Sequence, residues 1–200
     1  MISILTLSAC SVFGIRGGYE TLNYKVVDNV GKVEIREYPA RLAAEVSGAK
    51  TKNDAFRSLF KYISGANTLK SDISMTTPVQ VNVGSDKISM TTPVESLPTE
   101  NQGVKMRFFL PASLSIENAP KPLDPRIAII QIPLETLAVL TYSGFSSDTR
   151  FKKASSELES FLEKSDWKPQ SSATFLGYDP PFTLPFLRRN EVTVRVKKTE

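Results

Sequence analysis

Hydrophobic and polar positions alternate along most of the chain, in short runs that end at turn residues. After residue 18 this period of two predicts strands over residues 24–30, 32–38, 41–48, 104–110, 126–132, 136–143, 173–177 and 191–196. Two further strands are expected on either side of a Gly84-Ser85-Asp86 turn, and the proline-rich residues 111–125 are expected to form an ordered loop.

Two stretches change to the period of a helix. Residues 53–64 place apolar side chains at positions i, i+3, i+4 and i+7, and Gly65 stands where a helix commonly ends. Residues 147–164 do the same with Phe151, Ala154, Leu158, Phe161 and Leu162. Each pattern predicts an amphipathic helix with one apolar face.

The order of elements occurs twice. ARLAAEVSGAKTKNDAF at residues 40–56 and ETLAVLTYSGFSSDTRF at residues 135–151 each join a strand, a Ser-Gly pair and the start of a helix. We therefore predict that residues 19–110 and 126–198 form two equivalent βαββ halves, with Phe56 and Phe151 at matching positions. Two such units in one core give an α+β domain over residues 19–198, with a curved sheet or partial barrel and two helices against it.

Composition narrows the chemistry. The chain has no histidine and one cysteine, which excludes a Ser-His-Asp system, a histidine-based zinc site, an internal disulfide and a Cys₄ cluster. The carboxylates that remain as candidate bases have no nucleophile or metal set beside them: Glu34, Glu37, Glu45, Asp179 and Glu191. We expect a protein that is not an enzyme.

The net charge of +4 raises the question of nucleic acid. Nucleic-acid-binding proteins usually concentrate their cations on one face, with aromatic residues between them. The cations here are dispersed, and Glu191 interrupts the densest basic stretch, residues 188–198. We expect no nucleic-acid partner.

The N-terminal residues indicate an export signal. Residues 1–9 are apolar but too short to span a bilayer, and Leu7-Ser8-Ala9-Cys10 resembles a bacterial lipobox. We expect a lipid on Cys10, loss of residues 1–9, a tether over residues 11–18 and a true start a few residues upstream. This places the protein at a bacterial membrane, facing the periplasm or exterior; the alternative is an ordinary thiol.

One heptad occurs twice without change. Ile-Ser-Met-Thr-Thr-Pro-Val stands at residues 73–79 and again at residues 88–94. Two strands of a hairpin explain the pattern, with each proline at an edge or bulge. Met75 and Met90 are flexible side chains that suit a core or a flat aromatic ligand.

Three motifs in order resemble the SOUL haem-binding family. They are the doubled heptad, FKYISG at residues 60–65, and GYDPP at residues 177–181 followed by RRNEV at residues 188–192. The resemblance covers residues 19–198. It implies a distorted β-barrel of two pseudo-symmetric βαββ halves with two helices packed outside. It also implies non-catalytic binding of haem or another porphyrin in a shallow apolar groove beside the first helix.

The groove that the resemblance implies combines apolar residues with cations. The candidates on the first helix and on the loop before the last strand are Phe56, Leu59, Phe60, Lys61, Ile63, Phe182, Arg188 and Arg189. A core role for the helical stripe and a solvated role for the arginine pair are the alternatives.

The chain departs from the family at three places. Asn53 replaces a basic residue, Thr183 or Leu184 stands where a lysine is expected, and the iron-ligating histidine of some members is absent. Iron in a bound haem would have no imidazole ligand and would have only Tyr62, Met75 and Met90 as weak candidates.

Two other functions remain open from the sequence. The domain could be an effector-type barrel for another apolar or cationic ligand, as in related duplicated folds. It could also be a cell-envelope interaction module that uses residues 182–187 as a contact patch. In each case we expect a monomer.

Overall fold

All eight strands and both helices that the periodicity predicts are present in the computed structural model, which describes residues 19–82, 103–180 and 182–199. The helices are α1 (Lys52–Ile63) and α2 (Asp148–Glu163). The main strands are β2 (Lys25–Val30), β3 (Val33–Tyr38), β4 (Arg41–Ala49), β6 (Val79–Asn82), β7 (Val104–Phe109), β8 (Ile127–Ile132), β9 (Glu135–Tyr142), β11 (Thr174–Gly177) and β12 (Asn190–Lys198). Two short strands were not predicted, β1 (Glu20–Thr21) and β10 (Trp167–Pro169), and β5 (Thr76–Thr77) occupies only part of the strand expected over the first heptad.

The strand order of the large sheet confirms the duplication. The order is β2-β3-β9-β12-β11-β6-β7-β4-β8, with every pair antiparallel. If β2 is left out, the strands β3, β4, β6 and β7 of the first half correspond, in that order, to β8, β9, β11 and β12 of the second half. With each pair treated as equivalent, the strand order is the same when it is read from either end of the sheet. The two halves therefore join through β6 and β11 at a pseudo-twofold axis.

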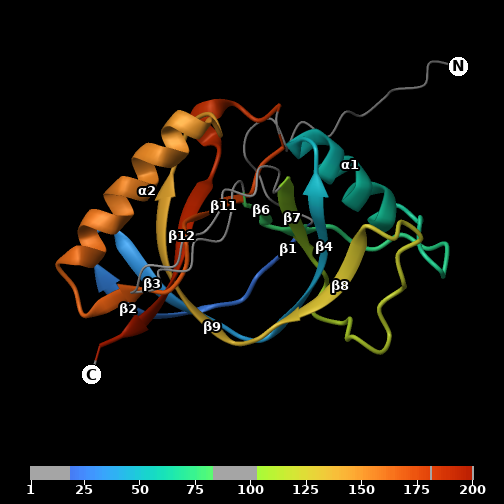
Figure 1. Ribbon diagram of the computed structural model, residues 1–200, viewed down its shortest axis with the longest axis horizontal. Helices are drawn as coiled ribbons and strands as arrows, with labels where there is room; N and C mark the ends of the chain where they lie inside the picture. The colour runs from blue at the N-terminus through green and yellow to red at the C-terminus, as the bar shows by residue number, and fades with distance from the viewer. Residues whose placement is uncertain (1–18, 83–102, 181, 200) are drawn as a thin grey trace, which may run out of the picture.

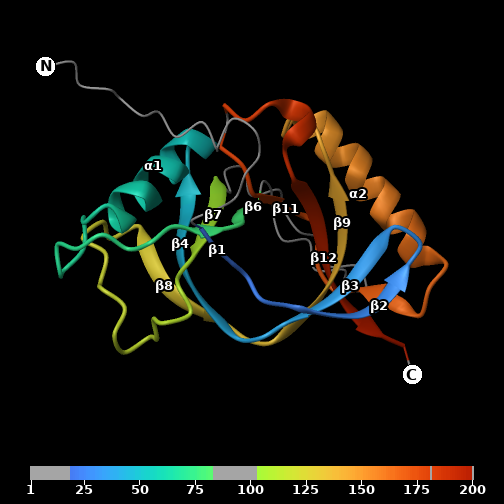
Figure 2. The ribbon, with the colours of Figure 1, turned by 180° about the vertical axis from the view of Figure 1, so that it is seen from behind.

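The sheet is curved but not closed. Its two end strands, β2 and β8, have no ladder between them in the described part of the chain. In Figures 1 and 2 the sheet forms two arms that curve toward each other, and each helix lies outside one arm. The α+β class is confirmed, whereas the expected barrel is an open one.

The match between the halves differs by one residue from the prediction. Thr51 and Ser147 are the two helix N-caps, and each accepts a hydrogen bond from a backbone N–H three residues later. Counted from these caps, the residue that matches Phe151 is Ala55, which is buried. The prediction that Phe56 matches Phe151 was wrong, because Phe56 lies one position, or about 100°, further around its helix.

The two faces of the sheet have different roles. Leu42, Ala44 and Val46 of β4 pack under α1 in one core cluster, and β12 supplies a second cluster under α2. Successive residues of a strand point to opposite faces, so the residues between these apolar positions face the concave side. The helices thus cover the outer face, whereas the concave face combines polar and charged side chains with two small apolar clusters around Leu137 and Phe109.

The first heptad lies at the join between the halves. Ile73 is buried, Met75 packs against the α1 core, and Thr76–Thr77 form β5 before β6 begins at Val79. The second heptad, Met90, the expected strand after the Gly84-Ser85-Asp86 turn and Cys10 lie outside the described residues. No helix in the described ranges is long and apolar enough to cross a membrane.

Candidate functional site

A row of three side chains follows one side of α1. Lys52, Phe56 and Phe60 are spaced four residues apart, which places them one above another on the helix. Phe56 and Phe60 are 38% and 48% exposed, and their rings stack with centroids 5.9 Å apart. Phe56 also meets the edge of the buried Phe108 of β7 at 5.3 Å. This contact turns the row, which we call the aromatic row, toward the middle of the sheet.

The opposite side of α1 is polar and faces β8. Arg126, just before β8, donates to the Ser58 hydroxyl at 2.7 Å and pairs with Asp54 at 3.5 Å. A second carboxylate, Asp124, holds the same guanidinium at 2.8 Å. These contacts fix the rotation of α1 and leave its aromatic row on the side toward β7 and β6.

A mostly apolar groove of about 320 Å³ lies between the N-termini of the two helices. We call it the inter-helix groove. Its residues are Lys52, Val81, Ser146, Ser147, Asp148, Phe151, Lys152 and Phe175. Val81 and Phe175 are partners across β6 and β11, so the strands at the pseudo-twofold axis supply the apolar side chains beside the two helix ends. Phe151 packs edge-on against Phe175 at 6.4 Å.

The groove carries cations at its edge. Lys52 donates to Asp148 at 2.8 Å, and this hydrogen bond lowers the pKa of the Asp148 carboxyl. The two side chains are 47% and 76% exposed, so water screens their attraction. Lys152, one turn further along α2, adds a second ammonium group. A negatively charged ligand can therefore compete with Asp148 for Lys52.

The predicted residues of the first helix divide into two groups. Leu59 and Ile63 are 0% and 5% exposed and belong to the core under α1, as the alternative reading expected. Phe56 and Phe60 belong to the aromatic row, and Lys61 is exposed in the last turn of the helix. Of the predicted residues on this helix, only Phe56, Phe60 and Lys61 expose side-chain surface that a ligand can contact.

The predicted loop residues lie beside the start of α2. Phe182 is 62% exposed, and the turn Pro185–Leu187 is tied to the strand-helix connection by the bond from Gly144 N–H to the Pro185 carbonyl, 2.8 Å. Arg188 donates to the Thr183 carbonyl at 2.8 Å, and its guanidinium lies 5.6 Å from the centre of the exposed Phe145 ring. The loop therefore presents aromatic surface and one cation near the groove.

Arg189 belongs to a different arrangement. It donates to the fully buried Glu191 at 2.6 Å, and Tyr178 and Arg36 donate to the same carboxylate at 2.7 Å and 3.0 Å. Burial, and then the charge of Glu191, raises the pKa of Tyr178 well above its usual range. Arg189 thus neutralises a buried carboxylate, whereas Arg188 remains at the surface of the loop.

The candidate iron ligands are placed unfavourably. Tyr62 is 1% exposed and donates its hydroxyl proton to the Pro120 carbonyl at 2.8 Å, and Met75 packs against the core. The described ranges hold no group of three residues among Cys, Asp and Glu that could bind a metal ion. Neither Tyr62 nor Met75 is therefore placed to ligate a metal ion in the inter-helix groove.

Several groove residues were missed by the sequence analysis. Val81 and Phe175 stand on strands far apart in the chain, and Lys52 and Lys152 looked like ordinary helix-surface residues. The only local signal was that Lys52 precedes Phe56 and Phe60 by multiples of four.

Comparisons with known proteins agree over nearly the whole described chain. A model of a family described as SOUL heme-binding protein matches residues 19–195. The protein named Heme-binding protein 1 from Xenopus laevis is 28% identical over 189 residues, which covers 88% of this chain and 92% of that protein. Its namesake from Xenopus tropicalis matches with the same identity and coverage.

Solved structures share the fold at low sequence identity. An uncharacterized conserved protein from Listeria innocua matches with a TM-score of 0.57 and 12% identity, over 83% of this chain and 92% of its own. The C-terminal domain of EcmrR matches with a TM-score of 0.53 and 12% identity, over 88% and 99%. Identity this low indicates a common fold and nothing about ligands.

Proposed function

The chain belongs to the SOUL heme-binding protein family, and from that premise we propose that it binds haem or a related tetrapyrrole, without catalysis, in the inter-helix groove and along the aromatic row. The observation that carries this proposal is the stacked pair Phe56 and Phe60, exposed next to the apolar groove. Ligand sites are concave, mostly apolar and carry a few polar groups, and this surface has those properties.

The aromatic side chains supply the area that a flat ligand needs. A tetrapyrrole offers two apolar faces, and each buried aromatic ring contributes free energy through removal of its surface from water. Phe56 is backed by Phe108, and Phe151 is backed by Phe175, so both rings are already fixed before a ligand arrives. Less conformational entropy is then lost on binding.

The cations near the groove would hold the acidic substituents. Lys52 and Lys152 lie at the groove itself, and Arg188 lies on the neighbouring loop. A charge-assisted hydrogen bond to a propionate is stronger than one between neutral groups. These cations orient the ligand, while the aromatic surface provides most of the affinity.

Bound iron would add redox and ligand-binding chemistry to the site. The residues of this chain contribute no histidine to it, and Tyr62 and Met75 are engaged elsewhere. We therefore expect the affinity to depend on the porphyrin disc rather than on the metal. The iron-free ring should bind nearly as well as haemin.

A pair of titrations tests the proposal. The wild-type protein is titrated with haemin and with iron-free protoporphyrin IX, and binding is followed by the Soret absorbance. We expect saturable one-to-one binding of both, in the low-micromolar range or weaker, with no bis-imidazole spectrum. Failure of both ligands to bind contradicts the function, and tight binding of haemin alone contradicts the absence of iron ligation.

The location of the domain is a second part of the proposal. Leu7-Ser8-Ala9-Cys10 supports lipidation of Cys10, which would hold the folded domain at a bacterial membrane. Intact mass of protein from its native locus should show a diacylated Cys10 at the mature N-terminus, and the Cys10→Ser variant should leave the membrane fraction. A free thiol in a soluble wild-type product contradicts the anchor.

A further inference from the structure

The concave face of the sheet contains a second cavity, separate from the inter-helix groove. Its volume is about 270 Å³, and its polar lining includes Arg41, Gln80, Asn82, Lys105, Arg107 and Arg195. We propose that this concave cavity binds a small organic anion, a carboxylate or phosphate that also carries a hydroxyl group. The site lies on the opposite face from the proposed tetrapyrrole groove and does not depend on it.

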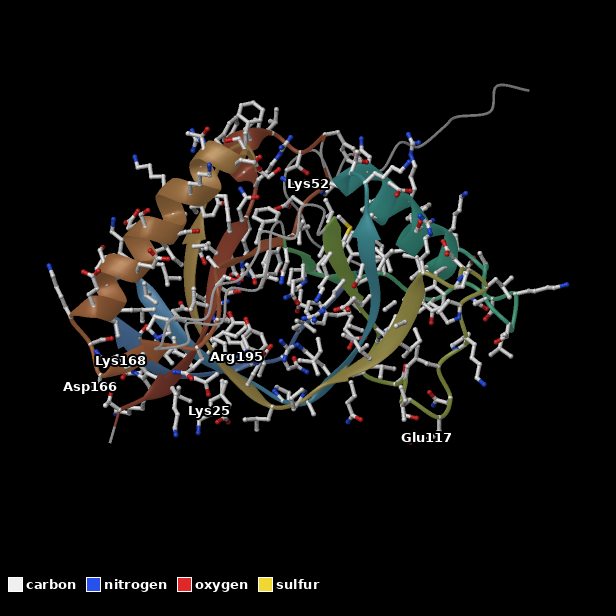
Figure 3. The ribbon with its side chains drawn as sticks, viewed as in Figure 1. Lys25, Lys52, Glu117, Asp166, Lys168 and Arg195 are labelled. Atoms are coloured by element: carbon white, nitrogen blue, oxygen red, sulfur yellow. The ribbon has the colours of Figure 1, made fainter. Side chains whose placement is uncertain are left out.

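The alternation of β12 separates the two sites. Val192 and Val194 pack under α2, so Thr193 and Arg195 point to the concave side, where both line the cavity. In Figure 3, Lys52 of the inter-helix groove lies near the upper end of the molecule and Arg195 lies toward the lower end.

Arg41 is the most strongly held cation of the cavity. Its guanidinium lies 4.9 Å from the centre of the Tyr38 ring and 5.1 Å from that of Phe109, and it donates to Glu135. The side chain is only 10% exposed, yet its Nε–H has no hydrogen-bond partner among the described residues. A buried donor without a partner destabilises the protein, so a ligand acceptor at this position would supply the missing hydrogen bond.

Two further arginines have donors to spare. Arg107 uses only its Nε, which donates to Glu45 at 2.5 Å, and this leaves both terminal nitrogens without a partner within the described ranges. The Arg195 guanidinium makes no hydrogen bond or ion pair to any residue that the structure describes. Planar guanidinium groups bind carboxylates and phosphates through paired hydrogen bonds.

An acceptor completes the lining. The Asn82 side-chain oxygen is buried, and no residue in the described ranges donates to it. A ligand hydroxyl can donate to this oxygen while its acidic group accepts from the arginines. The cavity thus favours a hydroxy acid or a sugar-type phosphate over a simple inorganic anion.

Charge and size support the same class of ligand. Four cations and one carboxylate, Glu135, line the cavity, so the local potential is positive and a cationic ligand is disfavoured. Pockets for drug-sized ligands span about 300–1,000 Å³. A cavity just below that range suits a molecule of metabolite size.

Nuclear magnetic resonance of the arginine Nε–H groups tests the proposal directly. Citrate and glycerol 3-phosphate are the two anionic probes, with glycerol as the neutral control and tetraphenylphosphonium as the cationic control. At least one anion should give saturable shifts at Arg41 Nε–H and Arg107 Nε–H and at the Asn82 amide. Citrate binding alone identifies a carboxylate site, and glycerol 3-phosphate binding alone identifies a phosphate site.

Matched variants separate the cavity from general electrostatics. Arg107→Gln and Arg195→Gln should each weaken binding of the anion by about five- to twentyfold. Lys153→Gln removes an exposed cation of α2 and should change nothing. Haemin binding should be the same in all three variants. The proposal is overturned if neither anion shifts the cavity signals, if only the cation does, or if Lys153→Gln weakens binding as much as the arginine variants.

Discussion

Lys52 and Asp148 occupy the same position in the two halves of the molecule, and they bind each other. Each is the first residue of its helix, directly after the N-cap Thr51 or Ser147, and the ammonium and carboxylate are 2.8 Å apart. The duplication has therefore produced opposite charges at matching sites. This ion pair spans the pseudo-twofold axis at the inter-helix groove.

Changing either member of this pair should alter haemin affinity in opposite directions. Asp148→Asn removes a negative charge and releases Lys52, so haemin should bind about two- to fivefold more tightly; Lys52→Gln should weaken binding by a similar factor. Both effects should shrink as salt concentration rises. The control is Lys32→Gln, which disrupts an exposed ion pair between Lys32, in the turn before β3, and Glu157 of α2. The same direction of change in both variants contradicts a role for Lys52 in holding the ligand.

The adjacent residues Leu59 and Phe60 should separate stability from binding. Leu59 is fully buried, so Leu59→Ala should lower the free energy of unfolding by about 2–5 kcal/mol. Phe60 is 48% exposed, so Phe60→Ala should lower it by less than about 1 kcal/mol while weakening haemin binding by at least tenfold. Urea denaturation and Soret titration measure the two quantities. A Phe60→Ala variant that unfolds easily and binds haemin normally would assign Phe60 to the core.

Two tyrosine hydroxyls should respond differently to removal. The Tyr62 hydroxyl donates to the Pro120 carbonyl, so Tyr62→Phe should cost about 1–2 kcal/mol of unfolding free energy. The buried Tyr142 hydroxyl has no partner in the described ranges, so Tyr142→Phe should be neutral or stabilising. Chemical denaturation of both variants checks this, and equal losses would contradict the assigned hydrogen bonds.

Stability should also fall in alkali. Burial raises the pKa of Tyr62 to about 12, and the same cause raises that of Tyr142 to about 12. Because the folded pKa exceeds the unfolded value of about 10, the neutral phenol favours the folded state fully below pH 10. That contribution is lost as pH rises from about 10 to about 12. Urea denaturation across this range should show the decline, and Tyr62→Phe should flatten it; a pH-independent unfolding free energy would refute the shifts.

The sequence predicted the regular elements well where a period had room to repeat. The strands of four or more residues with apolar alternation were found, and so were both helices. Strands β1 and β5 have only two residues each, which is too short for any period. Their pairing depends on the chain returning to the same place, which local pattern does not encode.

The candidate site was predicted only in part, for a physical reason. The helical period placed Phe56, Leu59, Phe60 and Ile63 on one broad face, but the sheet covers only the side of that face next to the buried Ala55 and Tyr62. Leu59 and Ile63 are therefore core residues, while Phe56 and Phe60 at the margin remain exposed. Val81 and Phe175 could not be found from sequence because β6 and β11 meet only when the two halves join.

The most direct test of the central claim is a map of where haemin sits. Haemin is added to isotope-labelled protein, and the paramagnetic broadening of backbone amide signals is compared with a titration of iron-free protoporphyrin IX. We predict broadening at Lys52, Phe56, Phe151 and Phe175, while the amide of Arg107 on the concave face stays sharp. Broadening centred on the concave face, or spread evenly over the surface, would contradict binding in the inter-helix groove.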